Sequence, residues 1–263
     1  MRILCIGDIF GRPGRAILKS KLAGLREELD ADFVIVNIEN AAGGRGISPK
    51  LYDEFSQLPI DVMTSGNHIW EQRDINNYLS EKKNLLRPHN APSDRPGKGF
   101  GVFPAKNGAL VGVINVQGRA HMHEGDVHAN PFTVVDQLVT DMHVSTPIIV
   151  VDIHAETTSE KKSMGWYLDG RVSCVYGTHT HVQTADEQVL PKGTAYLTDI
   201  GMTGPHDSVI GVRPQDGIKR FLSDGKEKNW EVADKGVAIN GLILEVDEKT
   251  GHALSIRRLQ IQE

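Results

Sequence analysis

The chain has few of the features that stabilise secreted or membrane-bound proteins. Among its 263 residues are only two cysteines, Cys5 and Cys174, and both fall in apolar runs, so we expect small core residues rather than a disulfide or thiolate ligands. No apolar run is long enough to cross a membrane, and residues 1–7 lack the apolar region and cleavage site of a secretory signal. These absences predict a cytoplasmic protein with no membrane partner.

An excess of basic residues is also absent. The formal net charge is −5, from 29 Lys and Arg against 34 Asp and Glu. Proteins that bind long nucleic acids carry a basic surface, so we expect no stable binding of long nucleic acids. A small phosphorylated ligand is compatible with the net charge. With 39% hydrophobic residues and no repeat or linker, residues 1–263 predict one domain with a full core. The sequence is also compatible with a homo-oligomer.

Apolar segments alternate with amphipathic ones, which predicts an α/β fold. The apolar segments read as buried strands of a parallel sheet, at residues 2–7, 33–37, 60–64, 147–153 and 172–176. Helices are expected in four places: a segment carrying Leu18, Leu22, Leu25 and Leu29 as one apolar stripe, then residues 49–57, 131–142 and 215–222. A further helical segment precedes residue 172.

Hairpins are predicted in three places. Residues 100–105 and 109–116 flank an Asn-Gly turn that favours positive φ. A second hairpin surrounds residues 190–193, and residues 237–246 pair with 252–260 in a third. Residues 118–130 and 199–211 read as loops, and the first of these carries His121, His123 and His128, which we interpret as polar loop residues.

Residues of the types that bind metals follow five of the predicted strands. Each has an ordinary role when taken alone, such as a helix cap, a turn or a core hydrogen bond. The carboxyl ends of strands in an open α/β sheet converge in space, however, so residues far apart in sequence can share one site. The candidates are Asp8; Glu39 and Asn40; Asn67 and His68; His154; and His179 and His181.

The pair His179 and His181 lies in Gly177-Thr178-His179-Thr180-His181, directly after a predicted strand. Side chains alternate in extended backbone, so both imidazoles are expected to point the same way, with Thr180 turned away. Two imidazoles placed side by side can bind adjacent metals. An H-x-H motif is weak evidence by itself, and its interpretation depends on the other strand ends.

Together these motifs resemble the calcineurin-like metallophosphoesterase superfamily, whose pattern is D-x-H, an acidic bridging ligand, G-N-H-[DE], a lone H and G-H-x-H. The corresponding residues occur here in the same order, as Asp8-Ile9-Phe10, Glu39-Asn40, Gly66-Asn67-His68, His154 and Gly177-Thr178-His179-Thr180-His181. The resemblance implies a four-layer α/β/β/α sandwich with the site at the carboxyl ends of the strands.

Three residues depart from that pattern. Phe10 stands where the first histidine ligand is usual, and Glu39 stands where the bridging acid is usually aspartate. Ile69 stands where an acid commonly follows the histidine of G-N-H. These departures resemble the bacterial YmdB-like branch, in which G-D-I-F-G opens the chain and E-N replaces G-D. Gly7-Asp8-Ile9-Phe10-Gly11 and Asn37-Ile38-Glu39-Asn40-Ala41 match it closely.

The YmdB-like resemblance implies two divalent ions, iron or manganese before zinc or magnesium. One ion would take Asp8, Glu39, Asn40 and His181, and the other Glu39, Asn67, His154 and His179. A hydroxide bridging the ions would attack the phosphorus while His68, adjacent to a ligand but not one itself, protonates the leaving group.

The expected function is hydrolysis of a small phosphodiester, such as a 2′,3′-cyclic nucleotide. Two alternatives stay open: a phosphomonoesterase, and a metal-bound regulatory protein with vestigial activity. No substrate-binding residue is assigned. Arg12 and Arg45 could contact phosphate, but solvated loop arginines are commoner, and the run Gly43-Gly44-Arg45-Gly46 is no phosphate-binding Walker motif. Glu156 and Asp199 are candidate partners of the ligands.

Overall fold

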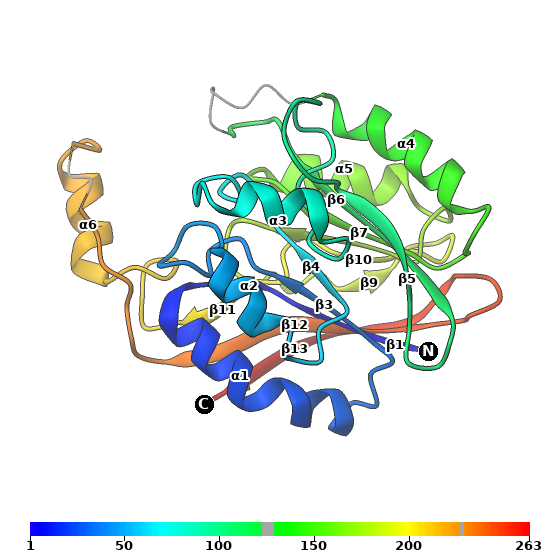
Figure 1. Cartoon of the computed structure of the whole chain (residues 1–263), viewed down its shortest axis with the longest axis horizontal. Coiled ribbons are helices and arrows are strands. Elements are labelled where there is room, and N and C mark those ends of the chain that lie inside the picture. The colour runs from blue at the N-terminus through cyan, green and yellow to red at the C-terminus, as the bar shows by residue number, and fades with distance from the viewer. Residues whose placement is uncertain (123–128, 227–228) are drawn as a thin grey trace.

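Two β-sheets pack face to face between layers of helices in the computed structural model, which describes residues 1–122, 129–226 and 229–263 (Figure 1). One sheet runs in the order β2-β11-β12-β1-β3-β4, with β13 paired to β12. Its strands are β1 (Arg2–Ile6), β2 (Asp8–Ile9), β3 (Phe33–Asn37), β4 (Val62–Thr64), β11 (Met202–Pro205), β12 (Val237–Val246) and β13 (Ala253–Gln262).

The second sheet has the order β5-β6-β7-β8-β10-β9. Its strands are β5 (Phe100–Pro104), β6 (Leu110–Gln117), β7 (Ile149–His154), β8 (Cys174–Thr178), β9 (Gln188–Val189) and β10 (Ala195–Leu197). The helices are α1 (Gly11–Glu28), α2 (Pro49–Phe55), α3 (Ile75–Glu81), α4 (Pro131–Met142), α5 (Thr158–Tyr167) and α6 (Pro214–Leu222). None of the helices in the described ranges has the length and apolar character needed to cross a membrane.

Three apolar layers hold these four layers of structure together. Alternate residues of β1 point to opposite faces, so Leu4 joins the core beneath α1, while Ile3 and Cys5 join the core between the sheets. A third core fills the space between β7 and the helices α4 and α5, where Val151 packs. The α/β/β/α sandwich predicted from the sequence is therefore confirmed.

Most predicted elements are present. The stripe on α1 is buried as expected at Leu18, Leu22 and Leu25, and both cysteines are buried and free. The expected loop at residues 199–211, however, contains strand β11, which pairs with β12 and β2. Helix α3 and strand β2 were not predicted from the sequence either. Strand β11, helix α3 and strand β2 are short, and two to seven residues carry too little periodicity to be recognised.

Close backbone contact at Gly7 fixes the junction between β1 and β2, which positions Asp8. A Cβ at Gly7 would lie 2.0 Å from the carbonyl oxygen of Gly201, whereas a Cβ at Gly24, exposed on α1, would meet nothing within 4 Å. The first position has no room for a methyl group, and the second has open space.

We expect Gly7→Ala to lower the free energy of unfolding by at least about 1–3 kcal/mol, because backbone must move to admit the methyl group. Gly24→Ala is the matched control and should raise the free energy of unfolding by about 0.5–1 kcal/mol, since alanine is the better helix former. Urea denaturation of both variants measures the difference. Equal stability of Gly7→Ala and the wild type would contradict the expectation.

Candidate metal centre

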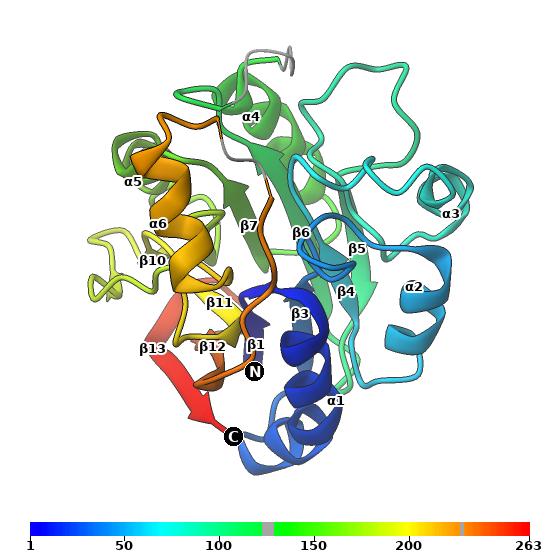
Figure 2. The same ribbon diagram turned by 90° about the vertical axis from the view of Figure 1, so that its left-hand side faces the viewer.

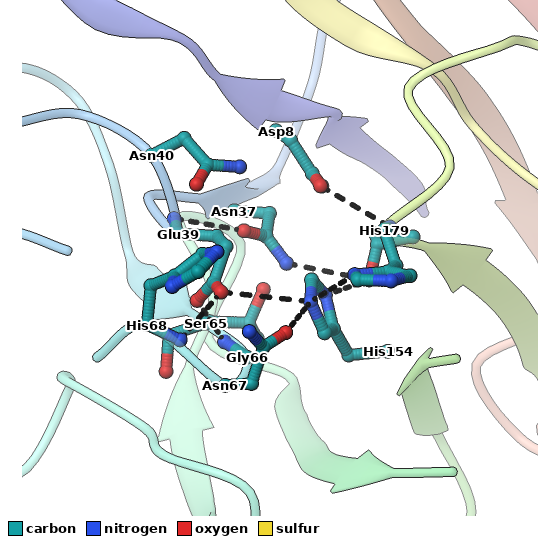
Figure 3. A network of polar contacts seen from close by, with 12 residues as sticks. Asp8, Asn37, Glu39, Asn40, Ser65, Gly66, Asn67, His68, His154 and His179 are labelled. Carbon is teal, nitrogen blue, oxygen red and sulfur yellow. Dashed lines mark hydrogen bonds and ion pairs between the residues drawn. The ribbon is translucent and has the colours of Figure 1, made fainter. Parts of the chain in front are cut away.

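The strand ends bring the predicted site residues together at one edge of the sandwich (Figure 3). Asp8 lies in β2, and His154 is the last residue of β7. Glu39 and Asn40 follow β3, Asn67 and His68 follow β4, and His179 and His181 follow β8. Strand β3 is parallel to β4 in one sheet, and β7 is parallel to β8 in the other. Hydrogen bonds from Asn37 and Thr64, at the ends of β3 and β4, to Asp152 of β7 bring the carboxyl ends of the two pairs together.

One group of these side chains surrounds His154. Its Nε2 lies 3.0 Å from Nδ1 of His179, 3.2 Å from Oδ1 of Asn67 and 3.6 Å from Oε1 of Glu39. The His154 imidazole is fully buried. These are the four residues expected around one of the two ions.

A second group surrounds His181. Its Nε2 lies 3.4 Å from Oδ2 of Asp8 and 2.9 Å from the side-chain amide of Asn40. The other oxygen of Asp8, Oδ1, is buried and has no hydrogen-bond partner among the described residues. An unpaired buried carboxylate oxygen is costly, so this group is short of one positively charged or hydrogen-bonding partner.

Each imidazole has one inner ring nitrogen, which faces the other proposed ligands, and one outer ring nitrogen, which faces away from them. A hydrogen-bond acceptor lies at each outer nitrogen. Thr178 Oγ1 donates its one proton to Asp152 at 2.8 Å, so it accepts from Nδ1 of His154 at 3.0 Å. Nδ1 of His181 donates to the carbonyl of Ile210 at 2.8 Å, and Nε2 of His179 lies 3.2 Å from the Glu156 carboxylate. In neutral imidazoles the inner nitrogens therefore carry lone pairs, the state in which histidine binds metals.

The backbone around the two histidines corrects one expectation. His179 and His181 have φ of 96° and 65°, so the segment is not extended, and the two imidazoles face different groups instead of lying side by side. The carboxylate of Asp199 accepts hydrogen bonds from the backbone and the hydroxyl of Thr180, at 3.2 and 2.7 Å. These bonds hold the turn between the two histidines.

A buried network beneath the site was not predicted. Asp152 accepts hydrogen bonds from Thr64 at 2.6 Å, from Thr178 and from Asn37 at 3.1 Å, and burial raises its pKa to about 7. Asn37 in turn accepts from the backbone of Glu39 at 3.0 Å. The one signal in the sequence was a charged residue at position 152, within its most apolar strand.

The buried carboxylates of the cluster favour a nearby cation, because burial disfavours their charged forms when no positive charge is near. Burial raises the pKa of Asp8, and it raises the pKa of Glu39 well above its ordinary value despite hydrogen bonds from the backbone of His68 and Gly66. Burial and the neighbouring His179 lower the pKa of His154 well below its usual range. Burial alone would lower the pKa of His181, but the hydrogen bond and charge of Asp8 raise it.

The residues fit divalent ions in chemistry and in spacing. Ligands held at about 2.0–2.2 Å from one ion lie about 3.0–3.6 Å apart, which is the range of the separations around His154. Within the described residues, however, no three or more His, Cys, Asp or Glu side chains are placed so that they could hold a metal ion without moving. Binding therefore requires adjustment of side chains that the fold has brought into contact.

A cavity of about 480 Å³ opens over the cluster. Asn40, His68, His179 and His181 form its floor. His68 is partly buried, and its Nδ1 lies 2.5 Å from the Glu71 carboxylate. The wall also includes Phe10, Arg45 and Glu156. The part that was not predicted from the sequence comes from residues within 209–220 and from Phe221, Asn229 and Trp230.

Other residues considered in the sequence lie apart from this cavity. Arg12 lines a different hollow, with Arg15, Lys19 and Lys50. His121 is exposed, and His123 and His128 lie outside the described residues.

Known proteins resemble this chain along its whole length. It is 43% identical over 263 residues to the 2′,3′-cyclic-nucleotide 2′-phosphodiesterase of Bacillus subtilis, covering 100% of this chain and 98% of the relative. The crystal structure of a novel phosphatase from Mycoplasma pneumoniae superposes with a TM-score of 0.92 at 36% identity, covering 100% and 94% of the two chains. A hypothetical protein from Thermus thermophilus gives 0.91 at 36% identity, covering 100% of both chains.

The family comparison agrees with the motifs. Residues 4–259 match the family described as YmdB-like protein, which confirms the resemblance seen in the opening G-D-I-F-G and in E-N. This chain belongs to the YmdB-like family.

Proposed function

We propose that the chain is a metal-dependent phosphodiesterase that hydrolyses small phosphodiesters, 2′,3′-cyclic nucleotides among them. The observation that carries the proposal is the set of inner imidazole nitrogens, which meet each other and buried carboxylates at the floor of a cavity. The full-length similarity to a relative named as a 2′,3′-cyclic-nucleotide 2′-phosphodiesterase supports the choice of substrate.

The proposed ligands form two sets that share Glu39. Asp8, Glu39, Asn40 and His181 would hold one ion, and Glu39, Asn67, His154 and His179 the other. These oxygen and imidazole donors, with no thiolate, suit iron or manganese, with zinc or magnesium as the alternatives. When bound, two such ions would activate water and draw negative charge from the phosphoryl group.

The charges of the proposed ligands limit the charge that a suitable substrate carries. Asp8 and Glu39 contribute two carboxylates, and the other proposed ligands are neutral, so two divalent ions leave the floor positive. A phosphodiester carries a single negative charge and suits that floor. The cavity is large enough for more than the phosphoryl group, which favours a nucleotide over a minimal ester.

His68 is the proposed general acid. Its backbone donates to Glu39 at 2.7 Å, and its Nδ1 lies beside the Glu71 carboxylate. Opening a cyclic nucleotide releases an alkoxide, which needs a proton. His68 lies beside Asn67 and lines the cavity, so it can act there without being a ligand.

Asp8→Ala and Asn67→Ala each remove one proposed ligand from a different ion. We expect both to lower the rate on 2′,3′-cyclic AMP and on bis-p-nitrophenyl phosphate by more than about 100-fold, since even changes outside the ligand set cost about 10–100-fold. Metal content by elemental analysis should fall in parallel. Asp94→Ala and Asn76→Ala, at exposed positions, are matched controls.

Activity that survives both substitutions would exclude the proposed site. A faster rate on phosphomonoesters than on diesters would favour a phosphomonoesterase. Full metal occupancy without turnover of any ester would favour the regulatory protein.

His68→Ala should separate proton donation from positioning. We expect a loss of about 10²–10⁴-fold on 2′,3′-cyclic AMP, whose leaving alkoxide needs a proton. A much smaller loss is expected on bis-p-nitrophenyl phosphate, because nitrophenolate leaves without one. Steady-state rates on the two substrates measure this difference. Equal losses would show that the His68 side chain acts by positioning, through its contact with Glu71, instead of by donating a proton.

A further inference from the structure

The cavity has a second half that the phosphoryl chemistry does not use. Three of the proposed ligands, Asn40, His179 and His181, line the cavity. The rest of its wall is aromatic and basic, with Phe10, Trp230 and Phe221 beside Arg45 and Arg220. Aromatic and arginine side chains are the groups on which proteins stack nucleobases. This wall therefore has the chemistry of a base-binding surface.

Trp230 is held in the wall by the pairing of its neighbours. The backbone of Arg213 donates to Glu231 at 2.9 Å, that of Ala233 donates to Gly211 at 2.9 Å, and Val212 forms a bridge with Val232. The indole is half-buried at the cavity. The paired backbone places Trp230, and contacts with Phe10 and Arg45 limit the freedom of its ring, so little is lost when a ligand stacks on it.

The indole also stands at a suitable distance from the reacting end. The centroid of the Phe10 ring lies 5.4 Å from that of His181 and 6.3 Å from that of Trp230. Phe10 thus contacts both the proposed ligand His181 and Trp230. A ribose links the phosphate of a cyclic nucleotide to its base in a similar way.

Arg45 lines the cavity over the Trp230 ring. Its guanidinium lies 5.6 Å from the centroid of the Trp230 ring and 3.6 Å from Glu71. A Cβ at the neighbouring Gly44 would lie 2.6 Å from the indole, so glycine lets this loop approach Trp230. A cation at the edge of an aromatic wall favours an electron-rich base.

Helix α6 stands out from the two sheets and borders the same cavity (Figures 1 and 2). Gly217 is its buried residue and packs on Val209, while Phe221 on the cavity side is 79% exposed. A planar ligand in the cavity would cover part of this apolar surface, which favours binding.

We propose that Trp230, flanked by Arg45 and Phe221, stacks on the nucleobase and makes the enzyme select nucleotides over phosphodiesters without a base. This inference rests on the proposed function. Stacking on one aromatic side chain changes binding by about 5- to 150-fold. Purines, with the larger ring system, should gain more than pyrimidines.

The test compares kcat/KM for 2′,3′-cyclic AMP with kcat/KM for glycerol 1,2-cyclic phosphate, which has no base, using the metal-loaded full-length protein. Trp230→Ala should lower the ratio of the two by about 5- to 150-fold, mainly through KM, and should reduce the preference for cyclic AMP over cyclic CMP. Trp230→Phe should recover part of the ratio. Trp166→Ala, 59% exposed on α5 and outside the cavity, is the matched control and should keep the wild-type ratio.

An unchanged ratio in Trp230→Ala, or an equal loss on both substrates, would overturn the inference. The equal loss would mean that Trp230 only supports Phe10 and His181. If the wild type hydrolyses neither diester, the proposed function fails, and equilibrium dialysis of 3′-AMP against glycerol 3-phosphate still tests the base site. Weaker binding of 3′-AMP alone to Trp230→Ala would then support it, and equal binding to the wild type and the variant would reject it.

Discussion

The site depends on the contact between Nε2 of His154 and Nδ1 of His179, which lie 3.0 Å apart. Acceptors at the outer nitrogens, the Thr178 hydroxyl and the Glu156 carboxylate, leave lone pairs on both inner nitrogens when the rings are neutral. Two lone pairs at this distance repel each other unless a proton or a cation lies between them. Burial lowers the pKa of His154 and so disfavours the proton. Under the proposed function, a divalent cation bound by both nitrogens would remove this repulsion.

Buried charges hold that contact in place. Asp199 and Lys161 are fully buried and 2.6 Å apart, and Asp199 also binds the backbone and hydroxyl of Thr180. The left-handed backbone of His179 and His181 on either side costs about 1–3 kcal/mol at each position. The hydrogen bonds to Asp199 offset this strain, so the geometry of the histidines depends on an ion pair beneath them.

The sequence was sufficient to group those site residues whose positions are determined by the end of a strand. Asp8, Glu39 and His154 could be grouped because the carboxyl ends of parallel strands meet at one edge. The sequence could not reveal the turned backbone at His179, because it depends on the distant carboxylate of Asp199. Trp230 was missed for a similar reason: it reaches the cavity through the pairing of residues 211–213 with 231–233, and neither segment has a recognisable period.

The two halves of the cavity come from different parts of the chain and meet at His181. The ends of β2, β3, β4, β7 and β8 supply the proposed ligands, and residues 206–226 and 229–233 supply Trp230 and α6. Within that second segment, the carbonyl of Ile210 accepts the Nδ1 proton of His181 and so directs its other nitrogen towards Asp8. The wall that we propose for the base thus also fixes the protonation state of a proposed metal ligand. A shift of this segment would alter selectivity and metal binding together, whereas a change confined to the Trp230 ring would alter selectivity alone.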